Sequence, residues 1–328
     1  MKKFKKVLAL TLAMVLVLGL FSGCGPQKAA GLYENGRLVK PWDDLLKEIG
    51  YTDFDGKEIK YKSREVKESA NNTTNTTYTS YFKPSDQDEK DKKKYDLVIP
   101  NGVTTIGAGA FRWCNHLKSI ALPNSVTSIG ENAFICCKAL ENINLPNSIK
   151  TIEENAFSGC ESLKSVKLPN SLTSIESSMF FLSGLTEIEI PNGVKILQDS
   201  AFLWCFDLVS VKIPNSVKSI GENAFSDCKN LEKINLPNSI TTIESGTFWG
   251  CEKLTEIKIP GSVTKIDSMA FADCKNLVSI TIPDSVTDIS GGEIVSSFDG
   301  CDKLTIYGSV TSFAKEYADY YDIPFVEK

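Results

Sequence analysis

The stretch Leu145-Pro146-Asn147-Ser148-Ile149, followed eleven residues after its proline by Phe157, decides the fold of this 328-residue chain. The same phrase returns along the sequence, and its prolines are Pro100, Pro123, Pro146, Pro169, Pro191, Pro214, Pro237, Pro260 and Pro283. Seven of the eight intervals between them are 23 residues, and the interval from Pro169 to Pro191 is 22. A fixed period of this length is typical of proteins built from stacked units. The sequence therefore predicts a solenoid, although length alone suggests two globular domains.

Each unit predicts one short strand followed by a turn. In the unit 231–243, apolar and polar residues alternate before Pro237, as in a strand with its apolar side chains directed inward. The proline ends the strand because it has no N–H to donate, and Asn238-Ser239 supplies turn-forming residues. The segment that leads to Phe248 is expected to form a helical or irregular turn opposite the strand. One unit buries too little apolar surface to offset the entropy of ordering it, so neighbouring coils must stack in parallel.

The N-terminus has the pattern of an export signal. Four lysines between Lys2 and Lys6 precede an apolar run from Val7 to Leu20, and Phe21-Ser22-Gly23-Cys24 follows. These last four residues resemble the bacterial lipobox, with Phe in place of the usual Leu, and the resemblance implies that Cys24 is lipidated and becomes the first mature residue. Ordinary secretion and an uncleaved anchor are the alternatives. Loss of the signal changes the formal charge from −5 to −9, which argues against nucleic acid and polyanions as partners.

Other segments lie outside the repeats. Residues 31–39 contain an Asn-Gly turn and predict a small hairpin, and the helical spacing of apolar residues over 42–49 predicts a short helix. Residues 69–95 are rich in Asn, Thr and charged side chains and predict a linker. The predicted organisation is a lipoprotein signal peptide at 1–23, an N-terminal leader with a short helix at 24–68, a polar linker at 69–95, a solenoid at 96–306 and a C-terminal cap at 307–328.

The last repeat and the tail depart from the pattern. Ser290–Ser297 adds about four residues to the last unit and predicts a bulged loop. Ser312 is expected to cap a helix, after which Ile323–Val326 forms a final strand. We expect this tail to cover the exposed core of the last coil. The helix residues expected to line one side are Phe313, Tyr317 and Tyr320 or Tyr321.

The phrases Ile-Pro-Asn-Gly-Val-Thr-Thr-Ile-Gly at 99–107 and Leu-Pro-Asn-Ser-Val-Thr-Ser-Ile-Gly-Glu-Asn-Ala-Phe at 122–134 resemble the BspA-like bacterial surface leucine-rich repeats. The resemblance covers about 95–306, and the leader and the tail also look like those that flank such repeats. It implies a leucine-rich repeat solenoid on the cell surface, some of whose relatives adhere to host matrix or to other bacteria. It implies no particular ligand, because the family shares no ligand-contact motif.

Eight of the ten cysteines recur at one position of the repeat, after its phenylalanine: Cys114, Cys137, Cys160, Cys205, Cys228, Cys251, Cys274 and Cys301. We expect a buried row of free thiols, because parallel side chains oppose disulfide geometry. A disulfide scaffold is the alternative in an exported chain. A zinc site is not expected, because four thiolates would have to converge on one ion. Cys136 stands outside the row.

Enzyme chemistry is not predicted, and neither is a cofactor. His116 is the single histidine, at a repeat position that other coils fill with Ala, Ser or Asn, so it is no general base. The carboxylate pair Glu153-Glu154 falls at variable repeat positions and is interpreted as a solvated face. The outward positions of the strands carry small and charged residues whose charges nearly cancel.

The turn before the cysteine row is the most uneven part of the repeat. Aromatic and leucine side chains replace small residues there, and the candidate partner-binding patch is Phe181, Leu182, Leu203, Trp204, Phe206, Trp113 and Trp249. Five of them lie beside the shortened unit, which has also lost its cysteine. Two explanations remain open: these side chains refill a core defect left by the deletion, or they form an exposed patch for a partner or a second copy.

The leading hypothesis is a lipid-anchored extracellular protein that mediates adhesion or binding to a protein or polysaccharide at the bacterial surface. The second is a structural or self-assembling component of the cell envelope, and the weakest is an enzyme of unknown type. Beyond the membrane reached through a lipid on Cys24, the sequence identifies no partner.

Overall fold

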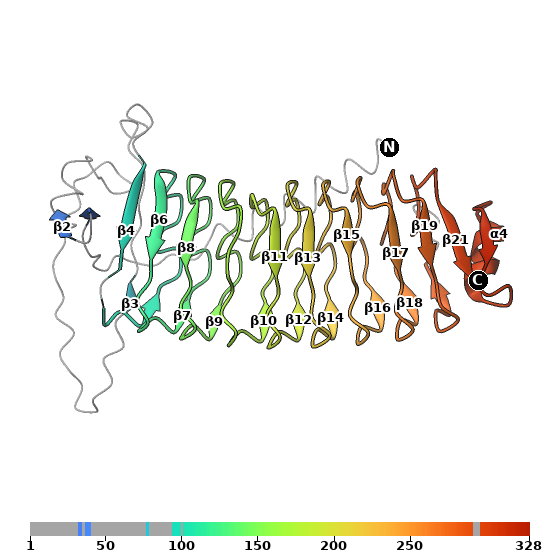
Figure 1. Ribbon diagram of the computed structural model, residues 1–328, viewed down its shortest axis with the longest axis horizontal. Helices are drawn as coiled ribbons and strands as arrows, with labels where there is room; N and C mark the ends of the chain where they lie inside the picture. Colours follow the sequence, from blue (N-terminus) through green and yellow to red (C-terminus); the bar gives the residue numbers. More distant parts are fainter. Residues whose placement is uncertain (1–31, 35–36, 41–76, 79–93, 100, 291–295) are drawn as a thin grey trace.

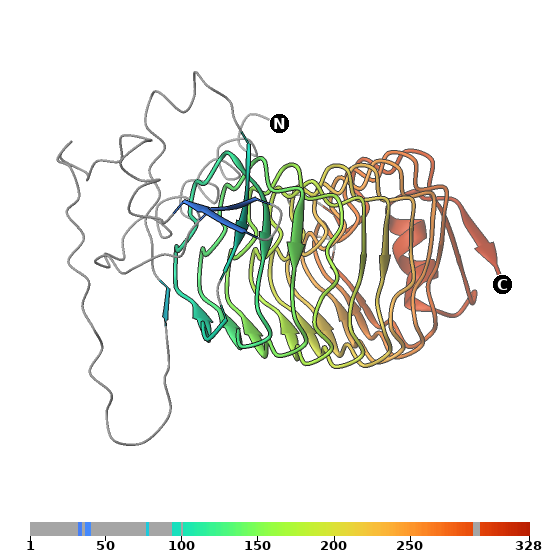
Figure 2. The same cartoon turned by 60° about the vertical axis from the view of Figure 1, so that its left-hand side comes forward.

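The computed structural model (Figure 1) describes residues 32–34, 37–40, 77–78, 94–99, 101–290 and 296–328. Between Tyr95 and Gly308 the chain winds into a stack of coils, which Figure 2 shows from a second direction. The predicted solenoid is therefore confirmed. The predicted signal peptide and the helix over 42–49 lie outside the described residues.

Most coils contribute two strands instead of the single strand that the sequence predicts. The first row consists of β4 (Tyr95–Val98), β6 (Leu117–Ala121), β8 (Asn142–Asn144), β11 (Glu187–Glu189), β13 (Ser210–Lys212), β15 (Lys233–Ile234), β17 (Glu256–Lys258), β19 (Ser279–Thr281) and β21 (Thr305–Gly308). The second row consists of β5 (Thr105–Ile106), β7 (Ser128–Ile129), β9 (Thr151–Ile152), β10 (Ser174–Ile175), β12 (Ile196–Leu197), β14 (Ser219–Ile220), β16 (Thr242–Ile243), β18 (Lys265–Ile266) and β20 (Asp288–Ile289).

Neighbouring coils pair in parallel, one repeat apart. Glu187 pairs with Ser210, and Ser174 pairs with Ile196 across the shortened interval. The second strand escapes sequence analysis because two residues are too few to show alternation. Its β-branched residues nevertheless favour extended backbone.

Phenylalanine rings form a continuous stack through the core. Their centroids lie 5.2–5.7 Å apart and their planes differ by at most 14°. Offset pairs of this kind contribute about 0.5–1.5 kcal/mol each beyond the burial of their area. One ring per coil thus links each coil to the next, in the order Phe111, Phe134, Phe157, Phe180, Phe202, Phe225, Phe248, Phe271 and Phe298.

The cysteine row runs beside these rings. All eight cysteines of the row are buried and free. Seven of these thiols, from Cys137 to Cys301, donate to the phenylalanine carbonyl of the preceding coil, as Cys228 Sγ does to Phe202 O at 3.2 Å. Burial raises the pKa of the Cys205 thiol to about 12. The row therefore fills space with small buried side chains, and its sulfurs follow one another from coil to coil without converging on one point.

The helical turns that we considered opposite the strands are non-helical turns with left-handed residues. The position just before the cysteine has positive φ in every coil, and it is filled by Trp113, Cys136, Gly159, Leu182, Trp204, Asp227, Gly250, Asp273 and Gly300. Only glycine adopts this conformation without cost. Large side chains at this position lie on the outer edge of the turn and outside the core. The candidate site is therefore on this edge of the solenoid.

The first strands of the chain add to the N-terminal end of the stack. β1 (Leu32–Glu34) and β2 (Arg37–Lys40) form an antiparallel pair, which confirms the predicted hairpin, and β1 also pairs with β4. β3 (Thr77–Tyr78) pairs in parallel with β5, although it falls within the stretch interpreted as a linker.

The C-terminal helix and strand lie at the other end of the solenoid (Figure 1). Helix α4 (Phe313–Tyr320) buries Ala314, Tyr317 and Ala318, and the Tyr317 ring meets Phe298 edge-on at 5.8 Å. β22 (Phe325–Glu327) pairs in parallel with β21.

Two details of the predicted cap are wrong. Phe313 does not line the packed side, because it is 37% exposed, and of the two tyrosines named as alternatives Tyr321 packs against the core while Tyr320 is 82% exposed. Ser312 occupies the N-cap position, but its hydroxyl donates to Ser309 O at 2.7 Å and makes no cap hydrogen bond.

Candidate functional site

The missing residue of the short repeat lies in the turn at Gly184. Other coils place two residues between the cysteine and the next leucine, whereas here only Gly184 separates Ser183 from Leu185. A Cβ at Gly184 would lie 1.9 Å from Glu161 O, so this turn presses against the preceding coil. Ser183 takes the cysteine slot, buried with its Oγ 3.3 Å from Cys205 Sγ.

The shortened coil has no core defect for aromatic residues to refill. Met179 and Phe180 are fully buried in the repeat positions of the core, and Ser183 fills the slot of the lost cysteine. Phe181 and Trp204 are only partly buried and lie outside the core. The first of the two explanations is therefore wrong: the deletion shortens a surface turn and leaves the interior continuous.

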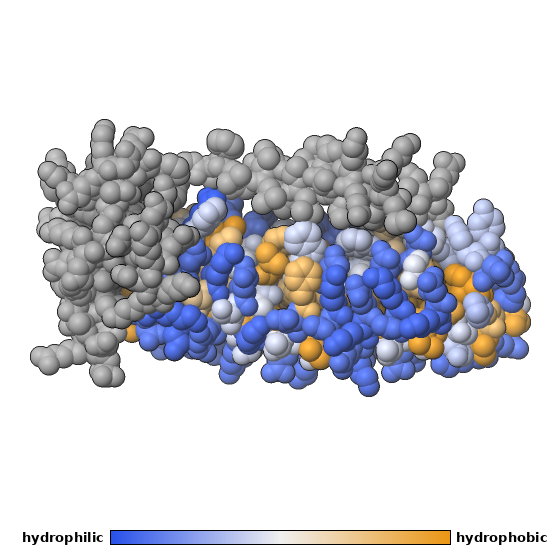
Figure 3. All heavy atoms as spheres, turned by 90° about the horizontal axis from the view of Figure 1, so that it is seen from above, coloured by the Kyte–Doolittle hydropathy of each residue, from blue (hydrophilic) through white to orange (hydrophobic). Residues whose placement is uncertain are grey.

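Five side chains gather at the turn edge of the shortened coil and its neighbour, and we call them the aromatic cluster: Phe181, Leu182, Leu203, Trp204 and Phe206. The Phe181 and Trp204 rings have centroids 5.2 Å apart, and Trp204 and Phe206 lie 6.4 Å apart. Leu182 N donates to Leu203 O at 2.9 Å, which holds the two turns together. Phe206 is the most exposed member, at 39%. Figure 3 views the molecule from this edge, with hydrophobic residues between hydrophilic ones over the middle coils.

Charged groups surround the aromatic cluster. Lys164 Nζ and Asp207 Oδ2 lie 2.8 Å apart, so an ion pair crosses the short coil between the coils on either side. Lys229 Nζ lies 5.9 Å from the centre of the Phe206 ring, within the range of a cation–π contact. Protein interfaces typically have an apolar centre surrounded by a polar rim, and the aromatic cluster with its charged neighbours has the same arrangement.

Asp227 lies in the coil after Trp204, beside the aromatic cluster. Partial burial raises the pKa of Asp227, while Lys229 and the Trp204 side chain act in the opposite direction. The edge of the cluster therefore includes one partly buried carboxyl group.

The other two tryptophans of the candidate patch lie elsewhere on the turn edge. Trp113 belongs to a coil four units before Trp204, is 48% exposed and has the Arg112 guanidinium 5.6 Å from its ring centre. Trp249 lies two units after Trp204, and its Nε1 donates to Asp273 Oδ2 at 3.2 Å. The structure thus brings five of the seven candidate residues together and leaves these two outside the cluster.

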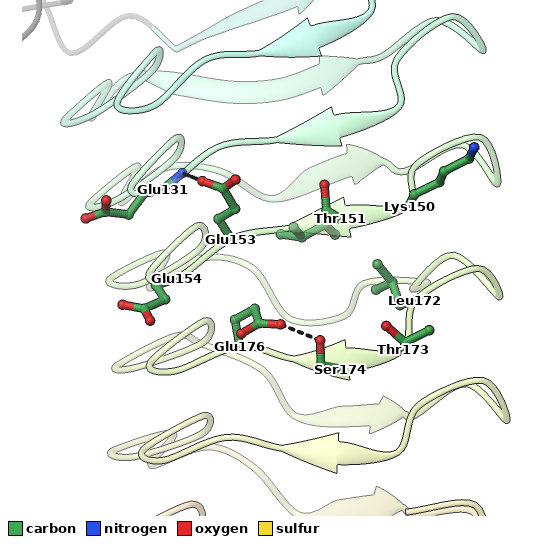
Figure 4. Close-up of a pocket in the computed structure, with 10 residues that line it drawn as sticks. Glu131, Lys150, Thr151, Glu153, Glu154, Leu172, Thr173, Ser174 and Glu176 are labelled. Atoms are coloured by element: carbon green, nitrogen blue, oxygen red, sulfur yellow. Dashed lines mark hydrogen bonds between the residues drawn. The ribbon is translucent and has the colours of Figure 1, made fainter.

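A hollow of about 460 Å³ lies on the second strand row, where the ladder is interrupted between β9 and β10. Sequence analysis missed it. Figure 4 shows its acidic side, where Glu131 N donates to Glu153 Oε2 at 3.0 Å and Ser174 donates to Glu176. Partial burial, with the carboxylates of Glu131, Glu176 and Glu153 nearby, raises the pKa of Glu154.

One sequence signal could have indicated this hollow. The two residues directly after the second strand include an acidic residue in seven consecutive coils, and in six of these coils there is one acid. Only the coil of Glu153-Glu154 carries two. Within the described ranges, no cluster of histidine, cysteine and acidic side chains is arranged to hold a metal ion. Among the described helices none is long and apolar enough to span a membrane.

The comparisons with known proteins agree with the fold. The family model described as the BspA type leucine-rich repeat region matches residues 90–209 and 195–318. A leucine-rich repeat protein from Bacteroides ovatus ATCC 8483 is 31% identical with a TM-score of 0.58, and the match covers 65% of this chain and 63% of that protein. The chain thus spans less than two thirds of the length of that relative.

Two further structures match with lower TM-scores. A leucine-rich repeat protein of T. pallidum is 30% identical with a TM-score of 0.40, over 56% of this chain and 81% of that one. A leucine-rich cell surface protein from Faecalibacterium prausnitzii A2-165 is 25% identical with a TM-score of 0.32, over 69% and 90%. No curated protein matches the chain.

Proposed function

This chain belongs to the BspA-type leucine-rich repeat family, and on that premise we propose that it is a non-catalytic binding protein, exported and lipid-anchored at the bacterial surface. The aromatic cluster is the binding site, and a protein is the class of partner that it fits. Export and the anchor rest on the N-terminal pattern that ends in Phe21–Cys24.

The position of the aromatic cluster outside the core, half-buried with Phe206 exposed, is the observation that carries this proposal. Repeat positions shared by all coils are explained by packing, but Phe181, Trp204 and Phe206 have no role in the core. Burying such rings against a partner removes apolar surface from water, which stabilises the complex by roughly 25 cal/mol per Å² of apolar area. Trp is also enriched among the residues that dominate binding energy.

A non-catalytic role is consistent with the chemistry of the described residues. His116 is partly buried on a turn, and burial raises the pKa of the Cys205 and Cys251 thiols, which keeps these two neutral near pH 7. A neutral thiol is a poor nucleophile. The acidic hollow lies on the second strand row, away from the turn edge that carries the aromatic cluster.

The double variant Phe181→Ser/Trp204→Ser tests the binding site. We expect it to lose at least about 90% of the captured partner in an unbiased pull-down from cell-surface extracts, because hot-spot aromatics cost about 2 kcal/mol or more when truncated. Its melting temperature should stay close to that of the native chain. Val278→Ser is the matched control, since Val278 is 51% exposed but lies outside the aromatic cluster. A lower melting temperature with unchanged capture would refute the site.

The lipid anchor has its own test. Cys24→Ala should move the protein from the membrane fraction to the medium, because the thioether linkage needs the cysteine sulfur. Retention of the variant in the membrane fraction would show that another element tethers the chain.

A further inference from the structure

One row of equivalent repeat positions runs along the turn edge through the aromatic cluster; four of its members are exposed, Glu252 is half-buried and Gly184 is buried. It occupies the position directly after the cysteine slot in six consecutive coils, and we call it the edge row: Lys138, Glu161, Gly184, Phe206, Lys229 and Glu252. The two central positions hold a glycine in a shortened turn and an exposed phenylalanine. Two oppositely charged residues lie on each side of them.

The charged residues form one ion pair within the chain on each side. Within the six positions, Lys138 Nζ and Glu161 Oε1 lie 2.9 Å apart, and Lys229 Nζ and Glu252 Oε1 lie 3.4 Å apart. Glu252 Oε1 also lies 3.2 Å from Nζ of Lys275, in the coil beyond the row. All four side chains keep between 36% and 57% of their surface exposed. Along the chain, the order Lys then Glu therefore occurs once before the apolar centre and once after it.

We propose that a second copy of this chain binds along the edge row, antiparallel to the first, about a two-fold axis between the coils of Gly184 and Phe206. The proposal rests on the proposed function, because it names the partner of the same aromatic cluster. The rotation places Phe206 of each copy over the shortened turn at Gly184 of the other. It also places Glu161 against Lys229, and Lys138 against Glu252.

The charges select this arrangement over its alternatives. A parallel pairing in register would set each lysine and each glutamate against its own copy, and like charges in contact are repulsive. An acidic or a basic partner would meet as many like charges as opposite ones along the row. A two-fold partner meets only opposite charges, and a self-complementary surface of this kind closes a dimer without growing into fibres.

The size of the row sets the strength of the dimer. Six coils at about 4.8 Å spacing extend roughly 24 Å. A ridge this narrow buries on the order of a few hundred Å² per copy, below the roughly 800 Å² of a standard interface. We therefore expect a reversible dimer with a Kd of about 10 to 500 μM, a range set by size class and not by summed contacts.

Sedimentation equilibrium on the exported chain, purified as a Cys24→Ala variant so that no lipid is attached, tests the proposal with three charge variants. Glu161→Lys places lysine against Lys229, and Lys229→Glu places glutamate against Glu161, so each should weaken the dimer at least about fivefold. The double variant restores opposite charges and should return the Kd to within about threefold of the native value.

The double variant separates the dimer contact from effects on the fold. It breaks both ion pairs within the chain, so a purely structural role predicts that it behaves worse than either single variant. The single variants change the net charge in opposite directions, so equal weakening excludes a general charge effect. Failure of the double variant to recover would overturn the proposal.

The two proposals fail in different ways. A chain that remains monomeric up to about 1 mM overturns the dimer. The proposed function then still stands if Phe181→Ser/Trp204→Ser loses its partner in the pull-down. If the cluster variants also keep every partner, both proposals are wrong.

Discussion

Gly184 shows how one residue determines the shape of the turn edge. The short repeat brings its backbone so close to the preceding coil that a Cβ would meet both the oxygen and the carbon of the Glu161 carbonyl. Neither atom can move without displacing the coil to which it belongs. Trp204 and Phe206 in the next coil therefore lie beside a turn that has no side chain at position 184.

Gly184→Ala should lower the melting temperature, because the added methyl group overpacks a backbone contact, at a cost of about 1–3 kcal/mol. Gly261→Ala is the matched control, since nothing lies within 4 Å of a Cβ at Gly261. Thermal unfolding followed by circular dichroism compares the two. Equal melting temperatures for both variants would show that the turn at Gly184 is not tightly packed.

At the scale of elements, the repeat pattern predicts the parts that recur and misses the parts that are short or irregular. The phenylalanine and cysteine rows follow from their 23-residue spacing, and the hairpin follows from its Asn-Gly turn. The second strand, at Thr151–Ile152 for example, is too short for its period to be visible. The left-handed turns are hidden because Trp, Cys, Leu and Asp fill positions that only glycine would have revealed.

The residues of the candidate site were predicted from the sequence, but their location on the surface was not. The sequence places Phe181 to Phe206 together because the two coils are adjacent, and it does not decide between core and surface. Whether these residues lie in the core or on the surface depends on Ser183 filling the slot of the lost cysteine, and only the packing of the folded chain shows this. The hollow at Glu154 depends on an interrupted ladder, and the partial burial of Asp227 depends on side-chain packing between coils.

The partial burial of the Asp227 carboxyl group predicts a pH dependence of stability. Because the folded chain raises the pKa of Asp227 above the ordinary value of 3.8, its contribution to stability is fully present below that value and is lost as the pH rises through the folded pKa. Asp227→Asn keeps the size and polarity of the side chain and removes the titration.

We therefore expect the native chain to lose stability relative to Asp227→Asn between pH 3 and pH 7. Urea midpoints of both proteins at several pH values measure this difference. A difference that stays constant, or that moves in favour of the native chain as the pH rises, would contradict the raised pKa.

At the scale of the whole molecule, the solenoid separates stability from recognition. Every coil repeats the same interior, so the stack tolerates changes on its turns as long as the phenylalanine and cysteine rows continue. The departures from the repeat concentrate near the middle, where one residue is lost and an apolar surface appears between two ion pairs. We propose that binding takes place at the shortened coil and that the regular coils hold it in place.

Photo-cross-linking from position 206 on whole cells tests this central claim most directly. A benzoylphenylalanine replaces Phe206 in one protein and Val278, another exposed apolar residue, in a second. The account predicts a discrete covalent adduct from position 206 and none from position 278, with an adduct of twice the chain mass where a second copy is the partner. Equal labelling from both positions, or none from position 206, would contradict it.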